Sequence, residues 1–115
     1  QDLVEAFRAT DNLAVKTLMV AAAAIVAPLV EETFFRGLFY GVIKRYTDGY
    51  FAALCSSLLF AVVHFHMGSF VPLVVLAFAF CLAYEVTGTL LVPMLMHAIF
   101  NGTSLVFLAF FNKAT

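Results

Sequence analysis

Charged residues are the scarcest class in this 115-residue chain. Only 11% of the residues are charged, 64% are hydrophobic, and the mean hydropathy is +1.05. So few charges cannot cover a surface that faces water, which excludes an ordinary water-soluble domain. The six basic and seven acidic residues nearly cancel, which excludes the basic field that a nucleic acid needs. The composition predicts an integral, multi-pass membrane protein whose partners include membrane lipids and no nucleic acid.

Cysteine is also rare, and residues 1–115 show no signal-peptide pattern. Cys55 and Cys81 stand alone in apolar runs without a C-x-x-C spacing, which argues against a metal knuckle or a redox pair and favours packing. The chain begins at Gln1 and has no basic segment followed by an apolar one, as a signal peptide would. We therefore expect residues 1–115 to be the core of a longer multi-spanning protein.

Four apolar runs dominate what is present. They cover residues 13–43, 50–66, 70–86 and 90–111, and charged or turn-forming residues separate them. A spanning helix needs about 20 apolar residues, and short turns make neighbouring helices antiparallel. The sequence thus predicts an all-α fold, a transmembrane bundle of about four helices. Residues 1–12 precede it as a short surface helix or, alternatively, as a frayed linker.

Polar side chains interrupt these runs at similar depths. Counting from the membrane face of the first and third turns at 1.5 Å per residue, Glu31 lies ~20 Å deep, His64 ~21 Å, His97 ~12 Å and Asn101 ~18 Å. His97 and Asn101 are four residues apart and so share a helix face. The counting predicts that three helices bring these groups into one layer.

Ionisable groups at such depth cost at least ~2.5 kcal/mol each and normally mark a function. Glu32 and Arg36 share a face, and Phe60 lies one turn before His64, where it would wall off a pocket. Ordinary explanations compete with the functional one. Glu32 and Arg36 can simply neutralise each other, and His64 alone would be a common core histidine.

Three motifs in this order resemble a known family. They are "EETFFRG" from Glu31, "FAVVH" ending at His64, and "HAIFN" from His97 to Asn101. Together they are similar to the E-E-x-x-x-R, F-x-x-x-H and H-x-x-x-N motifs of the CPBP group, the CAAX proteases and bacteriocin-processing enzymes, also called the Abi family of intramembrane proteases. The resemblance covers most of the chain and implies a hydrolase that cuts peptide bonds within or beside the membrane, as type II CAAX prenyl endopeptidases do.

The resemblance implies a role for each motif side chain: Glu31 and His64 would activate a water, His97 and Asn101 would stabilise the oxyanion, and Glu32 and Arg36 would support the site. Family members usually carry further spanning helices ahead of the first motif, and this sequence does not include them. No serine lies in a G-x-S-x-G context, so a water-based mechanism is expected. The implied partner is a peptide or protein substrate, with a prenylated C-terminus as one candidate.

A metal centre is the second choice for the chemistry. Glu31, His64 and His97 are of the types that form an open three-ligand zinc site, but the H-E-x-x-H spacing on one helix is absent. We therefore expect a glutamate-type endopeptidase without a cofactor and keep zinc as the alternative. Two further function classes stay open: a proton- or ion-coupled transporter, and a non-catalytic scaffold or immunity-type protein that binds a partner through the same pocket.

Pro28 lies inside the first apolar run, one turn before the carboxylates. It has no N–H to donate to the carbonyl of Ala24, so we expect a kink there. Our hypothesis is that this kink makes room for water near Glu31.

Overall fold

The computed structural model describes residues 2–65 and 67–111, and this part of the chain contains helices and no strand. The predicted all-α class is therefore confirmed. In chain order the helices are α1 (Asp2–Ala9), α2 (Leu13–Ala21), α3 (Ala27–Glu32), α4 (Gly41–Tyr46), α5 (Gly49–Val63), α6 (Phe70–Thr87) and α7 (Leu91–Phe111), with π-helical turns at Ala22–Val26 and Thr33–Tyr40 and a 3₁₀ turn at Met67–Ser69.

The segments from α2 to α4 join end to end into one helix, Leu13–Tyr46. It begins at Asn12, whose side-chain oxygen accepts hydrogen bonds from the amides of Ala14 and Val15 at 3.0 and 3.3 Å. The two π-helical turns lie on either side of α3, which carries the paired carboxylates. A π turn inserts one residue into the helical register, and such turns are frequent at functional sites.

The second predicted run ends earlier than the sequence indicated. Asp48 caps α5 by accepting from the amide of Phe51 at 2.8 Å, and the helix stops at Val63 rather than at residue 66. The reason is local: the His64 ring bonds back to the carbonyl of Phe60 at 2.7 Å, and Phe65 takes a positive φ of 50° that turns the chain away.

Within the described residues, three helices are long and apolar enough to cross a membrane: Leu13–Tyr46, Met67–Thr87 and Leu91–Ala109. The fourth, α5, has only 15 residues. At 1.5 Å per residue it reaches about 22 Å, which is shorter than the ~30 Å hydrocarbon core. Four helices form the bundle as expected, whereas a complete crossing by α5 stays a prediction.

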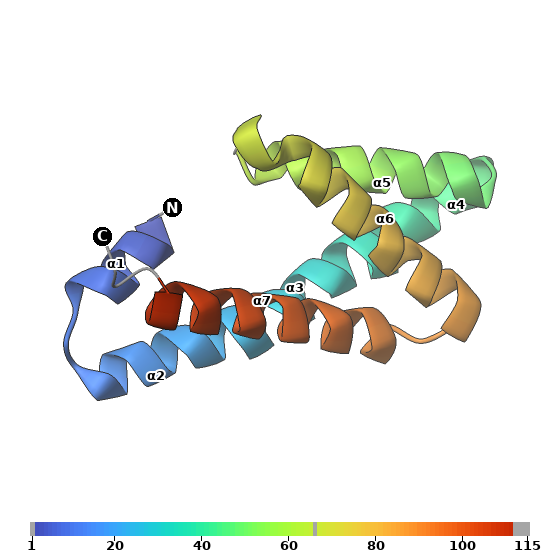
Figure 1. The fold of residues 1–115 in the computed structure, drawn as a ribbon. Coiled ribbons are helices and arrows are strands. Elements are labelled where there is room, and N and C mark those ends of the chain that lie inside the picture. The colour runs from blue at the N-terminus through green and yellow to red at the C-terminus, as the bar shows by residue number, and fades with distance from the viewer. Residues whose placement is uncertain (1, 66, 112–115) are drawn as a thin grey trace.

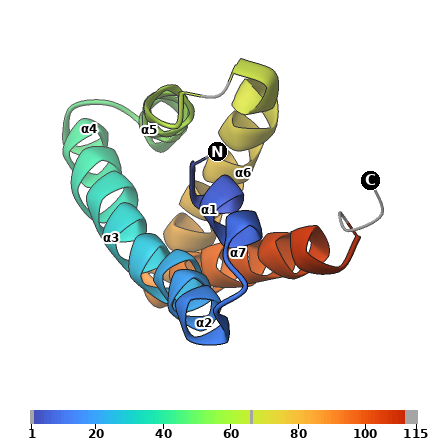
Figure 2. The same ribbon diagram turned by 90° about the vertical axis from the view of Figure 1, so that its left-hand side faces the viewer.

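The long helix organises the other elements. Figures 1 and 2 show α5 and α6 stacked against its C-terminal half, whereas α7 runs antiparallel along its N-terminal half. α6 ends at Gly88, whose φ of 69° suits the left-handed conformation that glycine adopts without strain, and the chain then turns into α7. Because α3 lies where the two groups of helices meet, its side chains can reach α5, α6 and α7.

Small side chains bring α5 and α6 close together. Ala52 and Ala53 of α5 pack with Cys81 of α6 and Tyr40 of the long helix, and all four are buried. Small residues permit close helix approach in membranes, where burial of apolar area against lipid gives little driving force. Cys81 therefore packs in the core, as the sequence predicted, and Cys55 is a free thiol.

Candidate active site

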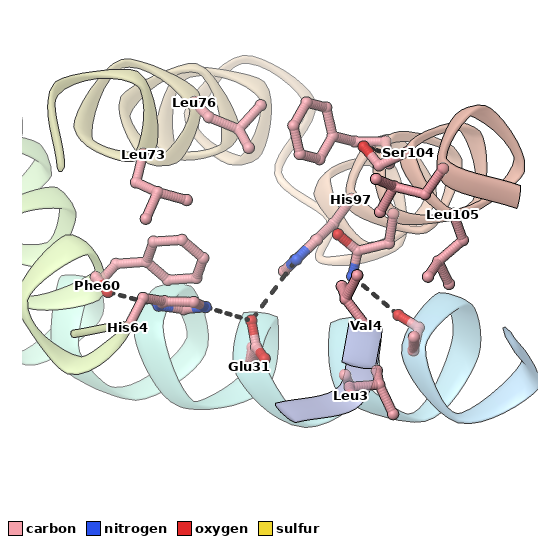
Figure 3. Close-up of a pocket in the computed structure, with 15 residues that line it drawn as sticks. Leu3, Val4, Glu31, Phe60, His64, Leu73, Leu76, His97, Ser104 and Leu105 are labelled. Carbon is pink, nitrogen blue, oxygen red and sulfur yellow. Dashed lines mark hydrogen bonds and ion pairs between the residues drawn. The ribbon is translucent and has the colours of Figure 1, made fainter. Parts of the chain in front are cut away.

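A pocket of about 320 Å³ lies at the junction of α3, α5, α6 and α7 (Figure 3). Four polar side chains that the motifs singled out line it: Glu31, His64, His97 and Asn101. The remaining walls are almost entirely apolar, and α1 contributes to them. Their main members are Leu3, Val4, Phe60, Leu73, Leu76, Phe100, Leu105 and Leu108. The pocket is an apolar space with one polar group of residues at its edge.

Glu31 lies between the two imidazoles. Its Oε2 atom is 3.7 Å from Nε2 of His64 and 3.6 Å from Nε2 of His97 (Figure 3). Oε2 is buried and makes no hydrogen bond, and both distances are slightly too long for one. Polar atoms at this spacing are commonly joined by a water that bonds to each of them. The geometry suits a small polar molecule bound between these atoms.

The hydrogen bond at Nδ1 of each imidazole determines whether its Nε2 atom is a donor or an acceptor. Nδ1 of His64 lies 2.7 Å from the carbonyl oxygen of Phe60, and Nδ1 of His97 lies 2.7 Å from Oε1 of Glu32. Both partners are acceptors, so each Nδ1 carries a hydrogen and donates it. In its neutral form each ring therefore turns a lone pair at Nε2 towards Glu31. Three acceptor atoms converge, and a bound water can donate to two of them.

Glu32 and Arg36 form a fully buried pair behind this site. Oε1 of Glu32 accepts from Nη1 of Arg36 at 3.2 Å and from Nδ1 of His97 at 2.7 Å. Nη2 of Arg36 donates to the carbonyl oxygen of Ala77 in α6 at 2.8 Å. The pair thus links the long helix to α6 and α7. The Glu32 carboxylate neutralises the Arg36 guanidinium and also holds the His97 ring, so the ordinary explanation and the supporting role both apply.

Two phenylalanine rings enclose the guanidinium. Arg36 lies 4.9 Å from the ring centre of Phe60 and 5.2 Å from that of Phe80, and such contacts stabilise a desolvated cation. Phe60 also packs against His64 at 4.3 Å, and Phe80 stacks on His97 at 5.0 Å. Phe60 walls the pocket as predicted. The sequence did not identify Phe80, since an aromatic residue in a phenylalanine-rich helix carries no distinguishing signal.

Asn101 has a partner that the sequence did not predict. Its Nδ2 donates to the carbonyl oxygen of Ala23 at 2.8 Å, across 78 positions of sequence. Asn101 still lines the pocket and is half-buried. One of its two N–H groups is therefore occupied by the backbone, and one remains for a bound molecule.

The zinc alternative stays a prediction. Among residues 2–65 and 67–111, no three His, Cys, Asp or Glu side chains are placed to hold a metal ion. Glu31, His64 and His97 approach one another, with Oε2 of Glu31 3.7 and 3.6 Å from the two Nε2 atoms.

Comparison with known proteins places this site in a family. Residues 13–103, which contain all the motif side chains, match the family described as "Type II CAAX prenyl endopeptidase Rce1-like". The chain belongs to this family. It is also 32% identical over 84 residues to the Bacillus subtilis (strain 168) protein named "Putative membrane peptidase YdiL". That alignment covers 73% of this chain and 34% of the relative, so the chain spans about a third of the relative's length. No solved structure matches.

Proposed function

We propose that this chain is the catalytic core of a membrane endopeptidase that hydrolyses a peptide bond with a water activated by Glu31 and His64. One observation carries the proposal: an unpartnered, buried Glu31 oxygen lies 3.7 and 3.6 Å from two imidazole nitrogens at the edge of an apolar pocket. Membership of a peptidase family supports the reaction class. The residues and their roles are our proposal.

Glu31 acts as the general base. A water placed between its Oε2 and Nε2 of His64 donates a hydrogen bond to each, which orients an oxygen lone pair towards the substrate. As that oxygen attacks the peptide carbonyl carbon, one water proton passes to Glu31. The scissile bond then breaks, and this proton leaves with the amine. General acid–base catalysis of this kind contributes about 100- to 10,000-fold.

The oxyanion forms opposite the attacking water. The free N–H of Asn101 is one donor, and His97 is the other when its Nε2 carries a proton. The carboxylate of Glu32 accepts the Nδ1 hydrogen of His97 at 2.7 Å, which fixes the orientation of the ring. Removing one oxyanion donor typically lowers the rate about 100- to 1,000-fold.

Glu32 and Arg36 position His97 rather than touch the substrate. The carboxylate holds the ring by Nδ1, and Arg36 holds the carboxylate from the other side at 3.2 Å. A hydrogen-bonded partner behind a catalytic histidine sets its tautomer and its orientation. In this proposal the two residues keep Nε2 of His97 aimed at the reacting atoms.

The substrate class follows from the walls of the pocket. Leucine and phenylalanine side chains surround the polar edge, so the chain flanking the scissile bond should be apolar. We propose a peptide or protein segment that lies within or beside the membrane. A prenylated C-terminus is one candidate, suggested by the family's description.

Peptide termini in membrane fractions test the proposal. Cells would express the wild type, Glu31→Gln, or Glu5→Gln, a control that changes an exposed carboxylate on α1 outside the pocket lining. Mass spectrometry would compare the new termini. We expect wild type and Glu5→Gln to share cleavage products that Glu31→Gln lacks. Identical termini in all three would contradict the peptidase proposal, and a cellular effect retained by Glu31→Gln would favour the scaffold class.

A further inference from the structure

The first π-helical turn leaves one backbone carbonyl without its usual partner. In Ala22–Val26 the hydrogen bonds run five residues back, and the amide of Ala27 donates to the carbonyl of Ala22 rather than to that of Ala23. In this register the next amide belongs to position 28. Pro28 has no N–H, so it cannot donate to Ala23. In this register the missing N–H of Pro28 therefore leaves the carbonyl of Ala23 open, and not that of Ala24, which the α register had predicted.

Asn101 fills that gap from another helix. Its Nδ2 lies 2.8 Å from the carbonyl oxygen of Ala23, and both residues line the pocket. A carbonyl oxygen can only accept, so the contact fixes which end of the side-chain amide points at the long helix. The direction of the second N–H of Asn101 is then fixed as well. The backbone of the long helix therefore orients a pocket-lining donor on α7.

We propose that Pro28 and Ala23 are positioning residues for Asn101. The missing N–H at position 28 keeps the carbonyl of Ala23 free, and this carbonyl holds the asparagine amide in one orientation. The consequence for oxyanion binding rests on the proposed function, whereas the contact itself does not. Pro28 is fully buried one turn before Glu31, so the same proline serves the helix that carries the general base.

Replacing the proline would release the asparagine. Pro28→Ala supplies an amide hydrogen, and the turn can then close in two ways. Residue 28 can donate to Ala23 in the π register, or the turn can return to the α register, in which Ala27 donates to Ala23. In both registers the carbonyl of Ala23 gains a backbone donor that competes with Asn101.

Unfolding in detergent tests the contact independently of catalysis. The four variants are wild type, Asn101→Ala, Pro28→Ala and the double variant. In the wild-type background Asn101→Ala leaves a part-buried carbonyl unpaired, and we expect the unfolding midpoint to fall by about 4–8 °C. In the Pro28→Ala background, adding Asn101→Ala should lower the unfolding midpoint by less than half as much. Equal falls in both backgrounds would overturn the inference.

Cleavage kinetics test whether Pro28 positions Asn101. Pro28→Ala should lower kcat about 10- to 100-fold with little change in KM, because a displaced donor weakens transition-state binding. In the Asn101→Ala background Pro28→Ala should cause no further loss. Losses that multiply would show that Pro28 does not act through Asn101. If the wild type cleaves nothing, the proposed function fails, and the unfolding data still decide the contact.

Two further variants distinguish loss of this contact from a general loss of folding. Pro93→Ala is the matched control: Pro93 is also fully buried, but it lies in the first turn of α7, where the first regular helical bond is made by Met94 to Leu90. Pro93→Ala should keep kcat within about twofold of the wild type, because the N–H that it adds lies in the first turn and has no acceptor within the helix. Asn101→Asp tests the contact without changing Pro28, because an ionised carboxylate keeps the shape and cannot donate. Unfolding of Asn101→Asp at the wild-type midpoint would also overturn the inference.

Discussion

Removing Arg36 should destabilise the protein more than any surface change. Arg36 is fully buried, and it donates to Glu32 at 3.2 Å and to the carbonyl of Ala77 at 2.8 Å between two aromatic rings. Arg36→Met keeps much of the volume but leaves Glu32 as a buried carboxylate without its cation. Breaking a buried pair from one side costs about 3–5 kcal/mol.

The double variant Glu32→Gln/Arg36→Met separates charge from packing. It removes both charges, and the glutamine oxygen can still accept from Nδ1 of His97. We expect it to be more stable than either single variant, because replacing both members of a buried pair leaves no isolated charge. Lys44→Met is the matched control for an exposed pair: the Lys44–Glu85 pair is about 40% exposed on each side and should contribute at most about 1 kcal/mol.

Denaturant titration in detergent micelles measures these differences. The chain has no tryptophan, so far-UV circular dichroism should follow the loss of helix. The free energy of unfolding would be compared at equal slope, since a changed slope signals a different unfolded or native state. Wild-type stability in Arg36→Met, or a double variant less stable than both singles, would refute the reasoning.

Two other predictions concern the backbone and the metal. Phe65 has a φ of 50° and is almost fully exposed, so Phe65→Gly should raise the free energy of unfolding by about 1 kcal/mol. Phe65→Ala keeps a Cβ and should not raise it. Equal effects of the two variants in denaturant titrations would contradict this prediction. Purified protein should cleave its substrate at an unchanged rate after EDTA treatment and contain well under one zinc per chain by elemental analysis. Loss of activity with EDTA and recovery with zinc would contradict this prediction and support the metal alternative.

The sequence predicted the helices better than their ends and registers. Apolar runs separated by charged turns were sufficient to find four helices, because membrane helices are set mainly by composition and length. The early end of α5 was not predictable from hydropathy, since it depends on the His64 ring bonding back to Phe60. The π-helical turns carry no sequence signal that a count at 3.6 residues per turn would reveal.

In the site, too, the sequence predicted some contacts and not others. The spacing of the motifs predicted that Glu31, His64 and His97 would approach one another, and the structure places both imidazoles within 3.7 Å of the Glu31 oxygen. The bond between Glu32 and His97 spans 65 positions, and the bond between Asn101 and Ala23 spans 78. Such contacts depend on how helices rotate against one another, and periodicity within one helix does not determine that rotation.

Cleavage by purified Glu31→Gln tests the central claim most directly. A membrane-embedded peptide carrying the identified cleavage site would be incubated in detergent with wild type, Glu31→Gln and Glu5→Gln at equal helix content. We expect Glu5→Gln to match the wild type and Glu31→Gln to be at least about 100-fold slower, because an amide cannot accept the water's proton. Cleavage by Glu31→Gln at the wild-type rate would show that this carboxylate is not the base.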